Sequence, residues 1–196
     1  MILALFCAVF LVAMTVLSHQ QRQLSEKLIR LHVVANSDTQ EDQAIKLRVR
    51  DAVLLEADQI MQAADEPRQA LQENLDKIHR AATKCLMNLS RSDTVTVRLG
   101  KELFPTRAYE TFSLPAGVYE SLRVSIGTGS GHNWWCVVFP SICLPAGSDD
   151  FSAAAQTAGM TAGEIRLITE TSPQYEIKFK TIELLQELKN FLTDMN

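Results

Sequence analysis

The sequence predicts an α+β domain in which two amphipathic helices pack on a mainly antiparallel sheet of about four to five strands. Three features carry this prediction: an early strand-like segment, two long segments with apolar residues at helical spacing, and a later series of short segments that alternate in polarity. An order of strand, helices and further strands is typical of a sheet with helices on one face. We expect an N-terminal export segment and a C-terminal helical tail to flank the domain.

Composition and charge agree with a packed domain. Hydrophobic residues make up 46 % of the 196 residues and charged residues 21 %, and both values are ordinary for folded proteins. The formal net charge of −4 leaves no basic excess to neutralise phosphates, and no local cluster of Lys and Arg compensates for it. We therefore expect no nucleic-acid partner.

Residues 1–18 predict a signal peptide or an uncleaved signal anchor. The run MILALFCAVFLVAMTVL contains no charged side chain, and as a helix it rises roughly 25 Å. This length is short for a membrane span and long for the core of a signal peptide, so both interpretations stay open. No Lys or Arg precedes the run, so the flanking charges favour neither orientation strongly. A buried N-terminal core helix is the alternative.

The first strand and the first helix are expected to meet at a polar junction. Residues 28–35 (LIRLHVVA) predict a strand, which the short polar side chains of residues 36–39 end. Asp38 and Thr39 are candidate caps for a helix that runs to about residue 64. The apolar stripe of this helix consists of Ile45, Val49, Ala52, Val53, Ile60 and Met61.

A second helix is expected to begin near Asp65, which can cap it, with Pro67 tolerated in its first turn. Cys85 lies on the apolar side of this helix, so we expect it to be a buried free thiol. Because the link is short, the two helices should form an antiparallel pair packed against an apolar surface. The stripe of the second helix consists of Leu71, Leu75, Ile78, Ala82, Cys85 and Leu89.

The remaining strands are expected at residues 94–99, 106–114, 117–126 and 134–139, separated by Gly and Pro turn signals. Residues 145–163 are rich in small and polar residues and predict a linker or loose surface loop. Residues 181–195 are amphipathic and predict the helical tail. The expected organisation is thus an export segment (1–18), an α+β domain (25–145), and a linker with a tail (146–196).

Several separated motifs resemble a known family. They are IRLHVVANSDTQEDQAIKLRVRDAV at residues 29–53, LFPT at 103–106, LPAGVYESLRV at 114–124 and GTGSGHNWWCVVFPSIC at 127–143. In this order they look like stage II sporulation protein R, and the resemblance covers roughly residues 25–145. The resemblance implies a protein that the forespore exports into the space between forespore and mother cell. There, family members activate a membrane-embedded aspartic protease, which cleaves the precursor of a mother-cell sigma factor.

The resemblance supplies no catalytic residue, so none is assigned, and no cofactor or metal is expected. The residues themselves point to partner contact at the strand-to-helix junction and in the tryptophan-containing segment. A well-capped helix with salt-bridged turns, and a hydrogen-bonded structural role for His32, stay open as alternatives. The candidate partner-binding residues are His32, Asn36, Ser37, Asp38, Asp42, Gln43, Lys46, Arg50, Asp51, His132, Asn133, Trp134 and Trp135.

Trp134 and Trp135 are adjacent in a predicted strand, so their side chains should point to opposite faces of the sheet. One can fill the core. The other is either an exposed anchor for a partner or covered by the tail or a helix. The glycines of residues 127–131 just before them lack the Gly-Lys-Ser/Thr ending of a phosphate-binding loop, so they predict a flexible hairpin loop.

Cys136 and Cys143 predict a disulfide, because the protein is expected to be exported. The alternative is a metal site with His132 as a third ligand, but its spacing matches no common zinc pattern and a fourth ligand is missing. Cys7 belongs to the export segment.

The alternative function is a secreted or membrane-tethered hydrolase that acts on the cell wall with Asp38 and Asp42. These carboxylates lie four residues apart near the start of one helix, whereas acid–base catalysis needs carboxylates that face each other across a cleft. A third possibility is an extracytoplasmic structural module, in which replacing either tryptophan alters stability only.

Overall fold

The structure is a computed structural model that describes residues 5, 12, 15, 16, 19, 21–62, 64–109, 112–140, 153–156 and 158–169. The chain divides into two compact units. The first comprises Met1–Lys27, Leu103–Tyr119 and Gly147–Asn196, and the second comprises Leu28–Glu102 and Glu120–Ala146.

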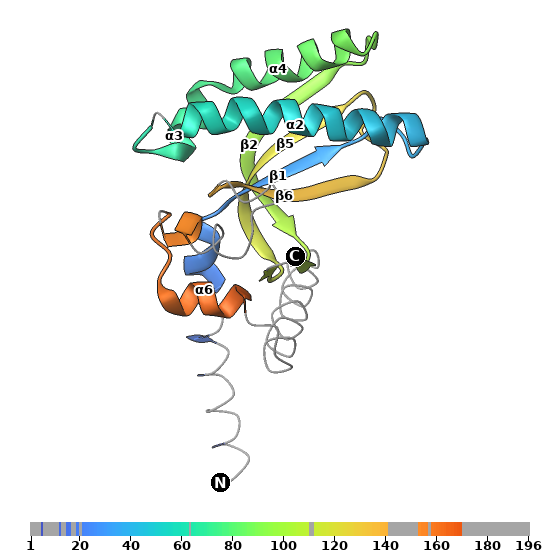
Figure 1. The fold of residues 1–196 in the computed structure, drawn as a ribbon. Helices are drawn as coiled ribbons and strands as arrows, with labels where there is room; N and C mark the ends of the chain where they lie inside the picture. The colour runs from blue at the N-terminus through green and yellow to red at the C-terminus, as the bar shows by residue number, and fades with distance from the viewer. Residues whose placement is uncertain are drawn as a thin grey trace, which may run out of the picture. The chain divides into compact units, whose positions relative to one another are not determined.

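The second unit is built on a four-stranded mixed sheet with strand order β2-β5-β1-β6 (Figure 1). The strands are β1 (Ile29–Val34), β2 (Val95–Phe104), β5 (Gly117–Ile126) and β6 (Asn133–Phe139). Strand β1 is central: it pairs in parallel with β5 and antiparallel with β6. The predicted α+β class, with helices on a mainly antiparallel sheet, is confirmed.

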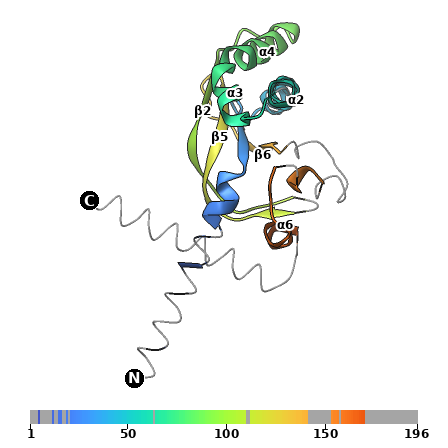
Figure 2. The ribbon, with the colours of Figure 1, turned by 90° about the vertical axis from the view of Figure 1, so that its left-hand side faces the viewer.

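Helices α2 (Gln40–Gln62), α3 (Pro67–Glu73) and α4 (Leu75–Asn88) cover one face of this sheet (Figure 2). Alternate residues of β1 divide between the two faces, as the pleat of a strand requires. Leu31 and Val33 belong to the apolar core beneath the helices, so His32 lies on the opposite face. The predicted stripes of the two helices supply the rest of the core, including Val49, Val53, Ile78, Ala82 and Leu86.

The second predicted helix is in fact two helices, because the chain leaves helical geometry at Asn74 (φ −118°, ψ 20°). The side chain of Asn74 donates to the carbonyl oxygen of Ala70 at 2.8 Å. Such local side-chain bonds compete with the helical ladder, which explains the break.

Two strand predictions differ from the structure. Strand β2 continues to Phe104, so Gly100, expected as a turn, lies inside it. The segment predicted as one strand at 106–114 instead contains two short strands, β3 (Arg107–Ala108) and β4 (Ser113–Leu114), which pair antiparallel as a separate small sheet. The aromatic rings of Tyr109 and Phe112 stack between them, with centroids 4.6 Å apart.

The first unit also contains α6 (Ala162–Thr169). Thr161 and Glu164 form a reciprocal capping box at its start, and Lys27 pairs with Glu164 at 2.8 Å. Ala155 and Met160 are buried. Most other described residues of 153–163 are exposed, so the predicted linker or loose loop at residues 145–163 stays a prediction.

Most of residues 1–18, with Cys7, and all of residues 141–152 and 181–195 lie outside the described residues. The export segment and the helical tail therefore stay predictions. Among the residues described, no helix has both the length and the apolar character needed to cross a membrane.

Candidate partner-binding site

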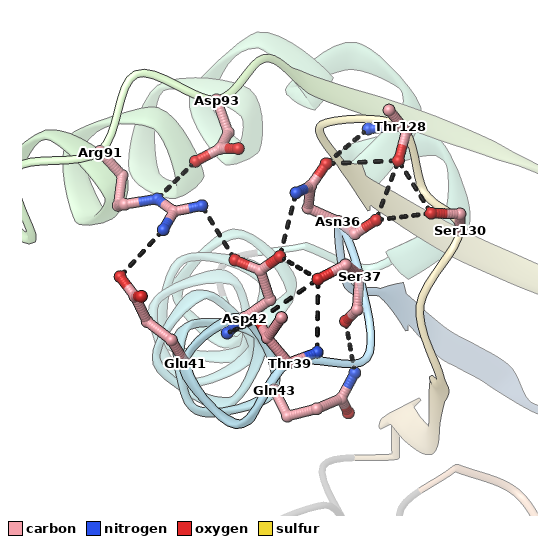
Figure 3. Close-up of polar contacts among 10 residues, drawn as sticks. All are labelled: Asn36, Ser37, Thr39, Glu41, Asp42, Gln43, Arg91, Asp93, Thr128 and Ser130. Carbon is pink, nitrogen blue, oxygen red and sulfur yellow. Dashed lines mark hydrogen bonds and ion pairs between the residues drawn. The ribbon is translucent and has the colours of Figure 1, made fainter.

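The carboxylate of Asp42 is the centre of the strand-to-helix junction (Figure 3). Its Oδ2 accepts hydrogen bonds from the Asn36 amide at 3.0 Å and the Ser37 hydroxyl at 2.6 Å. Thr39 is the helix cap, since its Oγ1 accepts the main-chain N–H of Asp42 at 3.2 Å. The prediction of a capped junction is confirmed.

Arg91 lies just after the end of α4 and binds this junction at the start of α2. Its guanidinium contacts Glu41 and Asp42 at 2.9 Å each and Asp93 at 2.7 Å (Figure 3). The hydrogen bonds from Ser37 and Asn36, with the nearby charge of Arg91, hold the pKa of Asp42 below its ordinary value. Asp42 is thus an ionised structural carboxylate. An ionised carboxylate is not a general acid, and the oxygens of Asp42 already bind Asn36, Ser37 and Arg91.

The glycine segment forms no hairpin, because β5 and β6 do not pair with each other: β1 lies between them. The connection crosses the end of β1 and binds Asn36. The side-chain oxygen of Asn36 accepts the N–H of Thr128 at 3.0 Å, and its main-chain oxygen accepts the hydroxyls of Thr128 at 2.9 Å and Ser130 at 2.7 Å (Figure 3). The predicted flexible hairpin is therefore wrong: this is a crossover connection anchored to the junction.

Two glycines make this close crossing possible. Gly127 has φ +57°, a left-handed conformation that glycine adopts without steric cost. A Cβ atom on Gly131 would lie 2.3 Å from the main-chain oxygen of Ser37, so a side chain there would force the two backbones apart.

His132, just after the crossover, is held by α2 and the residues before it. Its N–H donates to Asp38 at 2.6 Å, its ring pairs with the same carboxylate, and its carbonyl oxygen accepts from Lys46 at 2.9 Å. Lys46 also donates to Gln43 at 2.5 Å and is only 4 % exposed. Burial lowers its pKa, and the charge of Asp38 opposes that change. Lys46 is therefore a buried structural cation.

Arg50 extends the same surface. Its guanidinium carbon lies 4.5 Å from the centroid of the Trp134 ring, and its Nε and Nη2 donate to Asp51 at 2.8 and 2.7 Å. Trp134 packs against the core on the helix side of the sheet. The two predicted segments thus meet at one end of the sheet and form what we call the junction surface: Asn36, Ser37, Asp38, Asp42, Gln43, Lys46, Arg50, Asp51, His132 and Trp134.

The other three candidates lie on the opposite face of the sheet. The His32 ring nitrogens contact Asn133 at 2.8 Å and Glu102 at 3.0 Å, and its ring stacks on Trp135 with centroids 3.7 Å apart. The prediction that the two tryptophans point to opposite faces is confirmed, and so is a hydrogen-bonded His32.

Residues that bind these candidates from distant parts of the chain gave no sequence signal. Arg91 and Asp93 at the junction, and Glu102, Ser121 and Arg123 around His32, are brought there by the order of helices and strands. Thr128 and Ser130 lie within the glycine segment at residues 127–131, where their position between glycines is a sequence signal for a role at this site.

Cys136 is buried in β6, but Cys143 lies outside the described residues, so their disulfide stays a prediction. Cys85 is free and half-buried, and burial raises its pKa. Within the described part of the chain, no three His, Cys, Asp or Glu side chains are grouped as metal ligands would be.

Comparison with known proteins identifies the family. The family model for stage II sporulation protein R matches residues 25–148. Stage II sporulation protein R of Bacillus subtilis (strain 168) is 34 % identical over 124 residues, which is 62 % of this chain and 55 % of that protein. The chain therefore spans just over half the length of that relative. No solved structure matches significantly. The matched region contains both segments of the junction surface, and the chain belongs to the stage II sporulation protein R family.

Proposed function

We propose that this chain is an exported sporulation signal that activates a membrane-embedded aspartic protease. In this proposal the forespore makes the protein, and residues 1–18 direct it into the intermembrane space as a signal peptide or uncleaved anchor. The protease of the mother-cell side then processes the precursor of a mother-cell sigma factor. The protein acts as a ligand and catalyses no reaction itself.

The observation that carries the proposal is the family match over residues 25–148, which includes the whole junction surface. This surface combines a fixed framework with exposed groups. Asp42 and Lys46 are buried, whereas the side chains of His132 and Asp38 are 77 % and 54 % exposed. A preorganised surface of this kind loses little conformational entropy when a partner binds.

The proposal is tested by following cleavage of the sigma-factor precursor in cells that co-express the cognate membrane protease. Processing should require this chain, and it should be lost when residues 1–18 are deleted. If the exported and folded protein causes no processing, the proposed function is wrong.

The surface itself is tested with a matched pair of double variants. His132→Ala with Arg50→Ala removes groups from the junction surface, and Arg80→Ala with Lys84→Ala removes two exposed cations from α4. Only the first pair should abolish processing, with secretion and circular dichroism unchanged in both. Full processing with the first pair would show that the junction surface is not the contact.

A further inference from the structure

His32 is a buried titratable group that the junction surface does not use. It is 2 % exposed and lies at the middle of the central strand β1. Its register partners are Arg123 on β5 and Trp135 on β6. The side chain therefore connects both neighbouring strands across the sheet face opposite the helices.

Charged and polar groups surround the ring from each of these strands. Glu102 of β2 accepts from Arg123, from the Ser121 hydroxyl at 2.9 Å, and from His32 at 3.0 Å when Nδ1 carries the proton. Nη1 of Arg123 also lies 3.4 Å from Nδ1 of His32, and Arg30, two residues earlier on the same face of β1, is fully buried. Burial raises the pKa of Glu102, but its three hydrogen bonds and the neighbouring charges lower it overall.

The ring nitrogen on the other side, Nε2, lies 2.8 Å from the side-chain oxygen of Asn133 and therefore donates to it when it carries a proton. A neutral ring with its proton on Nε2 leaves Nδ1 as an acceptor, 3.4 Å from Nη1 of Arg123. A protonated ring keeps the bond to Asn133 and also donates from Nδ1 to Glu102. Protonation therefore makes the bond to Asn133, an exposed residue at the start of β6, a charge-assisted one and adds a bond to Glu102.

The ring of Trp135 should respond to the same protonation of His32. Its ring stacks on His32 with an interplanar angle of 21°, and a protonated imidazole attracts an aromatic face much more strongly than a neutral one does. Trp135 and Asn133 are also the other two candidate partner contacts on this face of the sheet.

We propose that His32 is a pH-sensitive clasp, which sets how firmly Asn133 and Trp135 are held and so regulates partner activation. The regulatory part rests on the proposed function, whereas the clasp itself does not. Burial lowers the pKa of His32 from its ordinary 6.5, although Asn133 and Glu102 oppose this. The neutral form is thus present near neutrality, and the protonated form appears on acidification.

The clasp is tested by the fluorescence of Trp135. The protein has two tryptophans, so Trp134→Phe leaves Trp135 as the sole emitter. Since a stacked imidazolium quenches indole emission, we expect a loss of emission on acidification, with its midpoint below the ordinary histidine value. Adding His32→Gln should abolish the transition, and adding His132→Gln should leave it intact. A transition that survives His32→Gln, or its absence in the Trp134→Phe protein, overturns the clasp.

If Trp134→Phe does not fold, the titration is followed in the wild-type protein by NMR. The His32 ring, the Asn133 side-chain amide and the Trp135 indole N–H should then shift with one common midpoint, and separate midpoints would overturn the clasp.

The regulatory part is tested by measuring precursor processing on both sides of that midpoint. A pH dependence lost in His32→Gln supports it, and pH-independent processing overturns it. If His32 titrates as expected but the sigma-factor precursor is processed at no pH, the result counts against the proposed function and not against the clasp.

Discussion

The ammonium group of Lys46 donates a 2.9 Å hydrogen bond to the main-chain oxygen of His132, 86 positions later in the chain. One helix residue thereby fixes the start of β6, where the exposed ring of His132 lies beside Asp38. Because Lys46 is held by two neutral oxygens and is nearly inaccessible, its contribution to partner binding would be to position its neighbours.

Replacing Lys46 by Met tests this positioning role. The carbonyl oxygen of His132 would lose its donor, and a hydrogen bond to a charged group contributes about 1.5 to 3 kcal/mol. We expect a loss of unfolding free energy in this range by urea denaturation, with faster hydrogen exchange in residues 132–135. The control is Arg48→Met, an exposed position on the same helix, which should change stability by less than about 0.5 kcal/mol. Equal effects at the two positions would contradict the structural role of Lys46.

Gly131 is predicted to tolerate no side chain. In Gly131→Ala the new methyl group would meet the main-chain oxygen of Ser37 at 2.3 Å, and backbone displacement of this kind costs about 1 to 3 kcal/mol. Gly100→Ala is the matched control, since a Cβ there meets no atom within 4 Å; it should be neutral or slightly stabilising. The measurement is the melting temperature of both variants by thermal unfolding. An undiminished melting temperature for Gly131→Ala would contradict the close crossing of residues 127–131 over the junction.

Local periodicity was sufficient to locate most elements. Strand β1 and helix α2 lie within two residues of their predicted bounds, and β5 matches residues 117–126, because alternation and helical stripes are properties of short segments. The strand order is a property of the whole chain. Nothing near the glycines indicates that β1 lies between β5 and β6, so the crossover was mistaken for a hairpin.

The same limitation applies to the site. Caps act within one turn, so the polar cluster around Asp42 could be predicted from residues 36–42 alone. The burial of Lys46 could not, because it depends on a segment 86 residues away that covers the ammonium. The partner of Asp42, Arg91, is likewise supplied by helix packing, which brings the end of α4 to the start of α2.

The junction should lose stability in acid through Asp42. Its pKa is lowered from 3.8 in the folded protein, so its contribution is fully present above that value and is lost as the pH falls through the folded pKa. We therefore expect Asp42→Asn to be less stable than wild type near about pH 7, with the difference shrinking below the unfolded value. Urea midpoints measured across this range provide the check, with Asp76→Asn, at an exposed position of α4, as control. If the stability difference between wild type and Asp42→Asn stayed constant with pH, this would contradict an ionised, hydrogen-bonded carboxylate at position 42.

The predicted disulfide can be tested with Cys85 as an internal reference. In exported, oxidised protein, non-reducing peptide mapping should recover Cys136 and Cys143 in one linked peptide, while Cys85, which is free, reacts with iodoacetamide after unfolding. Closing a short loop restricts the unfolded chain, so Cys136→Ser with Cys143→Ser should lower the unfolding free energy by about 2 to 3 kcal/mol.

Part of that loss of unfolding free energy in the double variant would come from placing a hydroxyl at the buried Cys136 position. The single variant Cys143→Ser separates the two effects, because it opens the loop without changing the buried side chain. Recovery of Cys136 as an alkylated free thiol, with Cys143→Ser as stable as wild type, would show that no such bond forms.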